Sequence, residues 1–153
     1  MRDDQVYLQR AVQLAAHNVA AGGRPFGAVL VKDGHVIAEA ANAIHLSQDP
    51  TAHAELLAIR AASQQLGPHL HGCVVYASGQ PCPMCLSAMH LCGVSRVVYA
   101  ASNEQAQPFG LSTAGVYAQM ALPLSAQALP VEHLEQPAMI GLYRDWQARH
   151  AAG

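Results

Sequence analysis

Two short motifs contain the residues of this chain best suited to holding a metal ion and moving protons. They are His53-Ala54-Glu55 and Pro81-Cys82-Pro83-Met84-Cys85. Imidazole nitrogen and thiolate sulfur are preferred ligands of Zn²⁺, and catalytic zinc sites use three protein ligands and leave a fourth position to water. A tight turn entering a helix would aim both cysteine sulfurs at one point, where the positive end of the helix favours thiolates. We therefore predict a zinc site with His53, Cys82 and Cys85 as ligands.

Glu55 lies two residues from His53 and outside this predicted ligand set. A carboxylate in that position can take a proton from water at the metal and return it to a substrate. We therefore predict that Glu55 is the acid–base of a hydrolytic reaction. A redox-active Cys-x-x-Cys pair and a structural zinc site are the alternatives. A structural zinc site needs four ligands, and the chain has no second Cys-x-x-Cys and no His-x-x-x-His.

The elements that must position these residues follow from hydrophobic periodicity and from the glycine and proline breaks. Asp33-Gly34 between two apolar runs is a strong hairpin signal. Asp49-Pro50 resembles a helix cap followed by proline in the first helical turn. We predict helices over 4–21, 51–65, 83–91, 112–119 and 137–149, and strands over 26–31, 35–40, 73–77, 94–100 and 129–134.

After the opening hairpin, strands alternate with helices, which favours a three-layer α/β/α domain with a mixed sheet. The composition is 52% hydrophobic and 12% charged, typical of a folded chain, and the length suits one domain over residues 1–153. We expect a cytoplasmic protein, because no apolar stretch is long enough for a membrane span and the first residues do not resemble a signal peptide. The net charge of −2 and the single lysine, Lys32, argue against a nucleic-acid partner.

The His-x-Glu and Pro-Cys-x-x-Cys pair is the signature of zinc-dependent nucleobase deaminases. On these motifs the chain resembles the cytidine deaminase-like superfamily. From about residue 4 to residue 149 it is similar to the bacterial guanine deaminase branch. The strings Pro25-Phe-Gly-Ala-Val-Leu-Val-Lys-Asp-Gly34 and Asp49-Pro-Thr-Ala-His-Ala-Glu55 carry that similarity. Several of these features also occur in tRNA adenosine deaminases.

The resemblance implies a five-stranded sheet in the order 2-1-3-4-5 and hydrolytic removal of an amino group from a small heterocyclic base, with zinc as cofactor. It also implies three substrate contacts: Asn42 bonds the base, Phe26 packs on it, and the Ala54 N–H contacts a ring carbonyl or nitrogen. Related enzymes pair through the second motif helix, and here that helix is apolar on more than one face. We therefore expect a homodimer.

The chain departs from the guanine deaminase pattern in three places. The acid expected after the fourth strand is absent, since the corresponding stretch contains Ser112-Thr113 and no Asp or Glu occurs between Glu104 and Glu132. A tryptophan is replaced around Leu91, and Gln80 stands where a glutamate commonly precedes Pro-Cys. Guanine is the first substrate candidate. Cytosine, a pterin, an aminotriazine and adenosine in tRNA remain alternatives, as does a non-catalytic zinc protein that serves assembly.

Overall fold

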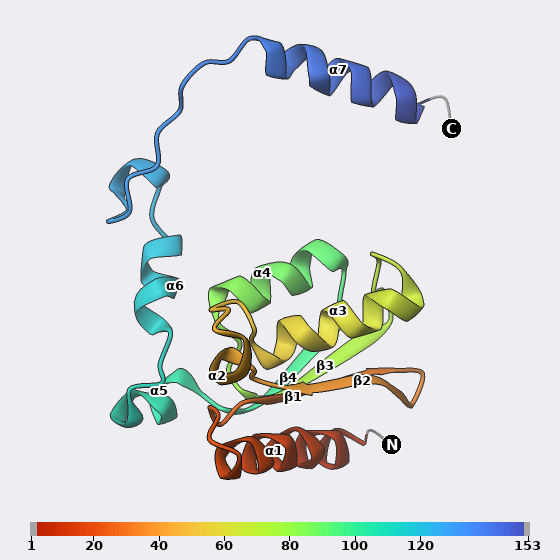
Figure 1. Ribbon diagram of the computed structural model, residues 1–153, viewed down its shortest axis with the longest axis vertical. Helices are drawn as coiled ribbons and strands as arrows, with labels where there is room; N and C mark the ends of the chain where they lie inside the picture. Colours follow the sequence, from red (N-terminus) through yellow and green to blue (C-terminus); the bar gives the residue numbers. More distant parts are fainter. Residues whose placement is uncertain (1–2, 152–153) are drawn as a thin grey trace. The chain divides into compact units, whose positions relative to one another are not determined.

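The computed structural model describes residues 3–151, and residues 1–2 and 152–153 of the predicted domain lie outside this description (Figure 1). The helices are α1 Asp4–Ala20, α2 Ile44–Ser47, α3 Ala54–Leu66, α4 Pro83–Cys92, α5 Asn103–Ala106, α6 Ala114–Met120 and α7 Ala138–Ala151, with 3₁₀ turns η1 Gln107–Phe109 and η2 Leu124–Ala126. The strands are β1 Gly27–Lys32, β2 His35–Ala41, β3 Cys73–Gly79 and β4 Arg96–Ala101. The chain divides into two compact units, Met1–Ala121 and Leu122–Gly153. The single domain over the whole chain stays a prediction.

The sheet lies in unit 1, and its strand order is β2-β1-β3-β4. β1 is antiparallel to both β2 and β3, whereas β3 and β4 are parallel. The β1–β2 turn confirms the hairpin prediction. Asp33 and Gly34 both have positive φ, 51° and 74°. Two residues in this conformation match the right-handed twist of the flanking strands.

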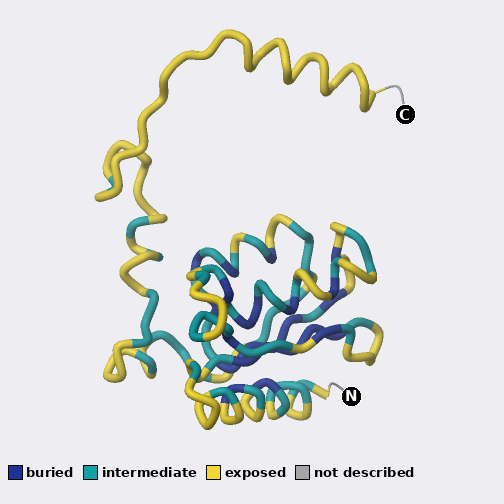
Figure 2. The backbone as a smooth tube through the Cα atoms, in the orientation of Figure 1, coloured by how far each residue is buried: buried dark blue, intermediate teal, exposed yellow. Residues whose placement is uncertain are grey.

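Helices cover both faces of the sheet (Figure 1). α1 packs on one face, where Ala11 contacts a buried cluster with Val29 and Tyr76. α3 and α4 cover the other face, where the core includes Leu30 and Val75. Figure 2 shows the buried residues concentrated along the strands and the inner sides of these helices. The predicted mixed α/β class with three layers is therefore correct.

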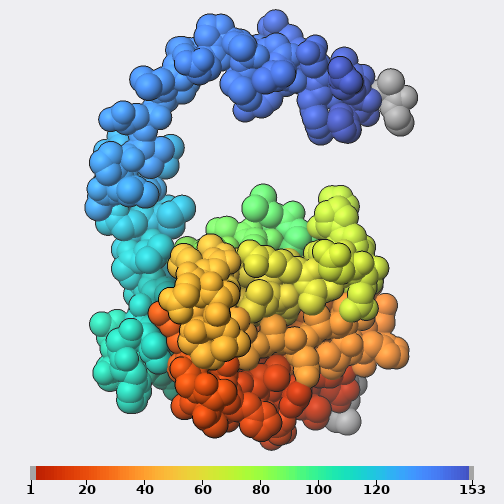
Figure 3. Space-filling model, viewed as in Figure 1, coloured from red at the N-terminus to blue at the C-terminus, as the bar shows by residue number. Residues whose placement is uncertain are grey.

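Figure 3 shows the side of unit 1 that carries α3 in yellow, with the hairpin in orange and α1 in red beside it. In this view α3 and α1 lie on opposite sides of the hairpin, and the side chains of the three elements pack against one another. Across the described residues, no helix combines the length and apolarity that crossing a bilayer requires.

The predicted fifth strand is wrong for the residues that the structure describes. Residues 129–134 form no strand, and the sheet there has four strands rather than five. Leu129 and Leu134 are exposed, and Pro130 has no N–H to donate to a ladder. A strand forms only where its backbone groups find a partner strand, and these residues find none in the described part of the chain.

The predicted helix start at 51 is also wrong, because α3 begins at Ala54. The Asp49 carboxylate accepts hydrogen bonds from the Thr51 N–H and the Thr51 hydroxyl, both at 2.8 Å. These bonds close a local turn instead of capping the helix. His53, with an extended backbone, takes the N-cap position.

Unit 2, described by itself, contains η2 and α7. The helix prediction over 137–149 is confirmed by α7. The helix buries none of its residues, and large apolar side chains such as Tyr143 and Trp146 are exposed. The Trp146 and His150 rings stack at 4.3 Å between centroids.

Gly27 is where α1 comes closest to β1. A Cβ added there would lie 2.3 Å from the Ala11 carbonyl oxygen and 2.9 Å from the Ala15 nitrogen, both backbone atoms of α1. We expect Gly27→Ala to lower the free energy of unfolding by about 1–3 kcal/mol, because the helix must shift away from the sheet. Denaturant unfolding measures this, with Gly115→Ala as the control, since its Cβ would meet nothing within 4 Å. Equal stability of the two variants would contradict this account of the contact.

Candidate active site

His53 reaches the site as the N-cap residue of α3, at the end of a loop fixed by backbone bonds. The Ala43 N–H donates to the Ala52 carbonyl at 2.9 Å, which closes the loop before His53. The His53 carbonyl then accepts the first helical bond from Leu57. The imidazole therefore projects from a rigid helix start.

The two cysteines come from the turn that joins β3 to α4. Cys82 is the N-cap of α4, Pro83 is its first residue, and the Cys82 Sγ accepts a hydrogen bond from the Cys85 N–H at 3.5 Å. Proline suits this first position, because its missing N–H has no helical partner there. The Tyr117 hydroxyl of α6 donates to the Pro81 carbonyl and holds the turn from the other side.

The structure brings His53, Cys82 and Cys85 together. The His53 Nδ1 lies 3.5 Å from each sulfur, and one ligand atom from each residue fits within 4.8 Å of the others. Tetrahedral bonds of the usual zinc lengths would place nitrogen and sulfur about 3.6 Å apart. The donor set and its spacing fit zinc, with His53, Cys82 and Cys85 as the residues that would hold it.

The electrostatics of the cluster favour a thiolate at Cys82. A hydrogen bond from the Cys85 thiol, with further bonds from His53 and the Cys85 N–H, lowers the pKa of Cys82 to about 4 despite partial burial. The same Cys82 partner, together with burial, raises the pKa of the Cys85 thiol. The hydrogen bond with Cys82 also raises the pKa of His53. The three side chains thus share protons that a divalent cation would displace.

Glu55 lies in the first turn of α3 and is only 7% exposed. Burial is the main cause that raises the pKa of its carboxyl group. A carboxyl group with a raised pKa is easier to protonate near neutral pH, which suits a group that must both accept and return a proton. Glu55 is therefore placed beside the cluster with the properties of a proton carrier.

A cavity of about 210 Å³ opens onto this cluster. It is lined by Arg24, Phe26, Asn42, His53, Glu55, Gln80, Cys82, Gly110, Leu111, Ser112 and Thr113. Asn42 is buried, and its Oδ1 accepts a hydrogen bond from the Ile44 N–H at 3.0 Å, which fixes the side-chain amide. Ala54 is buried at the start of α3 and does not itself line the cavity.

The structure therefore brings the predicted substrate residues Phe26 and Asn42 to the same cavity as the predicted acid–base and metal residues. Sequence reasoning did not identify Arg24 or the Gly110-Leu111 wall as part of it. Arg24 lies only two residues before Phe26, and this proximity in the chain could have indicated that Arg24 also lines the cavity. For the 110–113 loop the signal was the resemblance to guanine deaminases, which places Ser112-Thr113 where those enzymes have an acid, and the cavity confirms that this stretch lines the site.

A chain of side-chain bonds holds the 110–113 loop against the cysteine turn. The Gln80 Oε1 accepts from the Asn103 N–H at 2.9 Å, and the Asn103 Oδ1 accepts from the Thr113 N–H at 3.1 Å and from its hydroxyl at 3.4 Å. Gln80 thus has a structural partner in this chain. The wall that it supports presents hydroxyl groups from Ser112 and Thr113 rather than a carboxylate.

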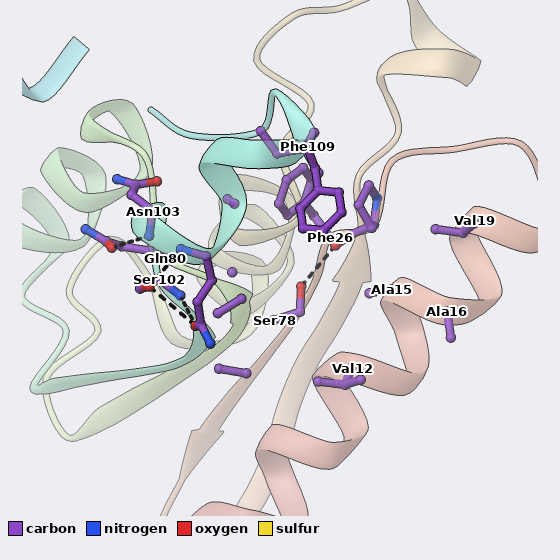
Figure 4. Close-up of a pocket in the computed structure, with 17 residues that line it drawn as sticks. Val12, Ala15, Ala16, Val19, Phe26, Ser78, Gln80, Ser102, Asn103 and Phe109 are labelled. Atoms are coloured by element: carbon purple, nitrogen blue, oxygen red, sulfur yellow. Dashed lines mark hydrogen bonds between the residues drawn. The ribbon is translucent and has the colours of Figure 1, made fainter. Parts of the chain in front are cut away.

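A second, apolar pocket of about 560 Å³ adjoins the first in unit 1 (Figure 4). Val12, Ala15, Ala16 and Val19 of α1 form one side of it, and Phe109 contributes from η1. Phe26, Gln80 and Leu111 line both pockets. Phe26 therefore separates an apolar space from the polar cavity that holds the chemistry.

Comparisons of the sequence with known proteins agree on one family. Residues 1–101 match the model of the cytidine and deoxycytidylate deaminase zinc-binding region. The chain is 40% identical to a guanine deaminase from Bacillus subtilis (strain 168) over 145 residues, which is 94% of this chain and 93% of that protein. It is 36% identical to a tRNA-specific adenosine deaminase from Aquifex aeolicus over 102 residues, 66% of this chain and 68% of that one.

Solved structures agree. The crystal structure of guanine deaminase from Bacillus subtilis superposes with a TM-score of 0.89 at 39% identity, covering 97% of this chain and 95% of that one. Guanine deaminase from Nitrosomonas europaea superposes with a TM-score of 0.67 at 27% identity, covering 76% and 72%. With its clustered His53, Cys82 and Cys85 and the buried Glu55 beside them, this chain belongs to the family of deaminases that carry the cytidine and deoxycytidylate deaminase zinc-binding region.

Proposed function

We propose that this protein is a zinc-dependent aminohydrolase that converts guanine and water to xanthine and ammonia. The observation that carries the proposal is the buried Glu55 beside the His53–Cys82–Cys85 cluster, at a cavity sized for a small ring. Similarity to the Bacillus subtilis guanine deaminase over nearly the whole chain supports guanine as the base.

When bound by His53, Cys82 and Cys85, zinc supplies a Lewis acid that lowers the pKa of water and stabilises developing negative charge. Glu55 accepts a proton from the attacking water and delivers it to the ring nitrogen next to the amino-bearing carbon. Glu55 then accepts the remaining proton of the added hydroxyl group and passes it to the amino group. The carbon–oxygen double bond forms as the carbon–nitrogen bond breaks, and ammonia leaves. Each proton that Glu55 accepts is returned, so the carboxylate is regenerated after every turnover.

Asn42, Phe26 and Ala54 are proposed to orient the base. The Asn42 side chain is fixed by its bond to Ile44 and supplies a hydrogen-bonding edge. Phe26 offers an apolar face for ring packing. The Ala54 N–H lies at the start of α3, where helix donors have no intrahelical partner.

Adenosine in tRNA is the competing substrate, because several relatives are tRNA-specific adenosine deaminases. Two observations favour the free base. The chain has a net charge of −2 and one lysine, whereas nucleic-acid binding depends largely on basic side chains. The cavity volume of about 210 Å³ also lies below the ~300–1,000 Å³ of sites for larger ligands.

Ammonia release from guanine, cytosine and an anticodon stem-loop at equal enzyme concentration separates these alternatives. We expect guanine to be turned over most efficiently. Inosine formation in the stem-loop without turnover of any free base would overturn the proposal. Turnover of cytosine, a pterin or an aminotriazine in preference to guanine would support the deaminase activity but change the proposed substrate. We would then attribute the different preference to the hydroxyl-lined wall at Ser112-Thr113.

We further propose that the enzyme is a homodimer that works in the cytoplasm. The support for pairing lies on α4, where Leu91 is 87% exposed and Met84 and Leu86 are half-buried. Exposed apolar surface of this kind is typical of interfaces.

We expect light scattering at micromolar concentration to give twice the mass of one chain. Leu91→Glu should shift the protein toward the monomer, because it places a charge in the interface, whereas Leu46→Glu on α2, also exposed, should not. A monomeric wild-type protein under these conditions would rule out the dimer.

A further inference from the structure

Arg24 is a charged residue of the cavity that the proposed reaction does not use. Its side chain lines the cavity and is exposed to solvent. Among the residues that the structure describes, ion pairs tie Arg10 to Glu39 and Arg96 to Asp4, but Arg24 takes part in no ion pair. A fixed positive charge therefore faces the mouth of the site without a protein counter-charge.

The backbone that carries Arg24 is held in place from several directions. The Asn18 side-chain amide donates to the Arg24 carbonyl at 2.7 Å and to the Asn42 carbonyl at 2.9 Å. The Phe26 N–H also donates to the Arg24 carbonyl, at 2.8 Å. Pro25 further restricts Arg24 to extended conformations. These bonds fix the position of Arg24 relative to two residues proposed to hold the base.

The packing before Arg24 is close at Gly23, where a side chain would displace His45 or Asn18. A Cβ at Gly23 would lie 2.4 Å from the His45 ring and 2.6 Å from the Asn18 side-chain nitrogen. The absence of a side chain at Gly23 lets Asn18 reach both carbonyls. The loop is thus built to hold its arginine at one place on the rim.

The acidic side chains of the described cavity lining are Glu55 and Cys82, and both belong to the proposed chemistry rather than to an ion pair with Arg24. Apart from the buried Glu55, the described residues that line the cavity include no carboxylate, and the wall at Ser112 and Thr113 carries hydroxyl groups. Arg24 therefore offers a positive charge at the cavity to an anionic group of a ligand.

We propose that Arg24 is a specificity-determining residue that binds an anionic oxygen substituent, a carboxylate or a phosphate, on the part of the aminated ring that points out of the cavity. This inference rests on the proposed deaminase function and extends its substrate class to acidic aminated heterocycles. The planar guanidinium group, with its two parallel N–H donors, matches the geometry of both anions.

Two matched substrate pairs distinguish the two sources of the anion: pterin against 6-carboxypterin, and guanosine against guanosine 5′-monophosphate. For the wild-type enzyme we expect the anionic member of at least one pair to have the lower KM. Arg24→Gln should raise the KM of that member by about 10-fold, the size of a charge-assisted bidentate interaction partly open to solvent, with kcat and the neutral member little changed.

Arg60→Gln is the matched control. It removes the same charge from α3, where Arg60 is bonded to Thr51 and does not line the cavity. Raising the salt concentration from about 10 mM to about 200 mM should reduce the difference in KM between the anionic and the neutral substrate of the wild-type enzyme, because the contact is exposed.

Equal KM values for both members of both pairs in the wild-type enzyme would overturn the inference. An equal response to the two arginine substitutions would also overturn it.

A binding measurement separates this inference from the proposed function. Pterin fluorescence reports binding of the pterin pair to Glu55→Gln without turnover. In that background the carboxylate should bind about 10-fold more tightly than pterin, and adding Arg24→Gln should remove the difference. If this difference is found while the wild-type enzyme releases no ammonia from any ring, the proposed function fails and the role of Arg24 stands. If ammonia is released, Arg24→Gln leaves both pterin affinities unchanged and the guanosine pair shows no difference in KM, the role of Arg24 fails alone.

Discussion

Glu55→Gln is expected to lower kcat by about 10²–10⁴-fold while zinc content and thermal stability stay close to the wild-type values. The amide is nearly isosteric with the carboxylate but cannot accept and return a proton near neutral pH. Glu55 is buried beside the cluster without being part of it, so the substitution removes proton transfer and leaves the three candidate metal ligands in place.

The measurement is steady-state ammonia release together with metal analysis of the same preparation. Glu104→Gln is the matched control, because Glu104 is an exposed acid on α5 outside the cavity and should retain full activity. Wild-type turnover by Glu55→Gln would show that another group moves the proton.

Cys82→Ser and His53→Ala are expected to lose zinc and activity together. These residues are two of three clustered donors, and within the described residues no other group of three or more such side chains forms a cluster. A site with three protein ligands has no spare ligand to compensate for the loss of one. We therefore expect well below one zinc per chain after dialysis and no measurable ammonia release.

Cys92→Ser and His90→Ala are the matched controls, because both residues lie at the end of α4 and outside the cluster. Both should keep about one zinc per chain. Thermal unfolding of all four variants separates loss of metal from loss of fold. Full zinc content in both Cys82→Ser and His53→Ala would place the metal elsewhere and contradict the site described above.

The metal cluster could be predicted from the sequence because local rules determine most of its geometry. The spacing of Cys82 and Cys85, with proline between them, is compatible with one helix start, and the structure places both residues there. His53 and Glu55 share the start of one helix for the same reason. In each case two residues close in sequence share one rigid element. The contact between the two elements is long-range, and it was inferred from the occurrence of both motifs in one chain.

The parts that could not be predicted depend on contacts between distant segments. Arg24 lines the cavity because the Asn18 side chain bonds to the carbonyls of Arg24 and Asn42. Leu111 lines it because Asn103 and Gln80 hold the 110–113 loop. Composition and periodicity do not encode such bonds.

Two predictions of local structure failed for a related reason. The segment 129–134 has the apolar pattern of a strand but no partner in the described residues, and Asp49 forms its bonds with Thr51 rather than capping a helix. In both cases the pattern was compatible with the predicted structure, while the available hydrogen-bond partners favoured another.

The central claim is hydrolytic deamination of guanine at the His53–Cys82–Cys85 site, and isotope labelling tests it most directly. The zinc-loaded protein is incubated with guanine in H₂¹⁸O, and the product is analysed by mass spectrometry alongside an ammonia assay. The mechanism predicts xanthine that carries one ¹⁸O atom, because water replaces the amino group, with one ammonia released for each xanthine formed. Unchanged guanine with no ammonia, under conditions where the protein holds one zinc per chain, would contradict the account.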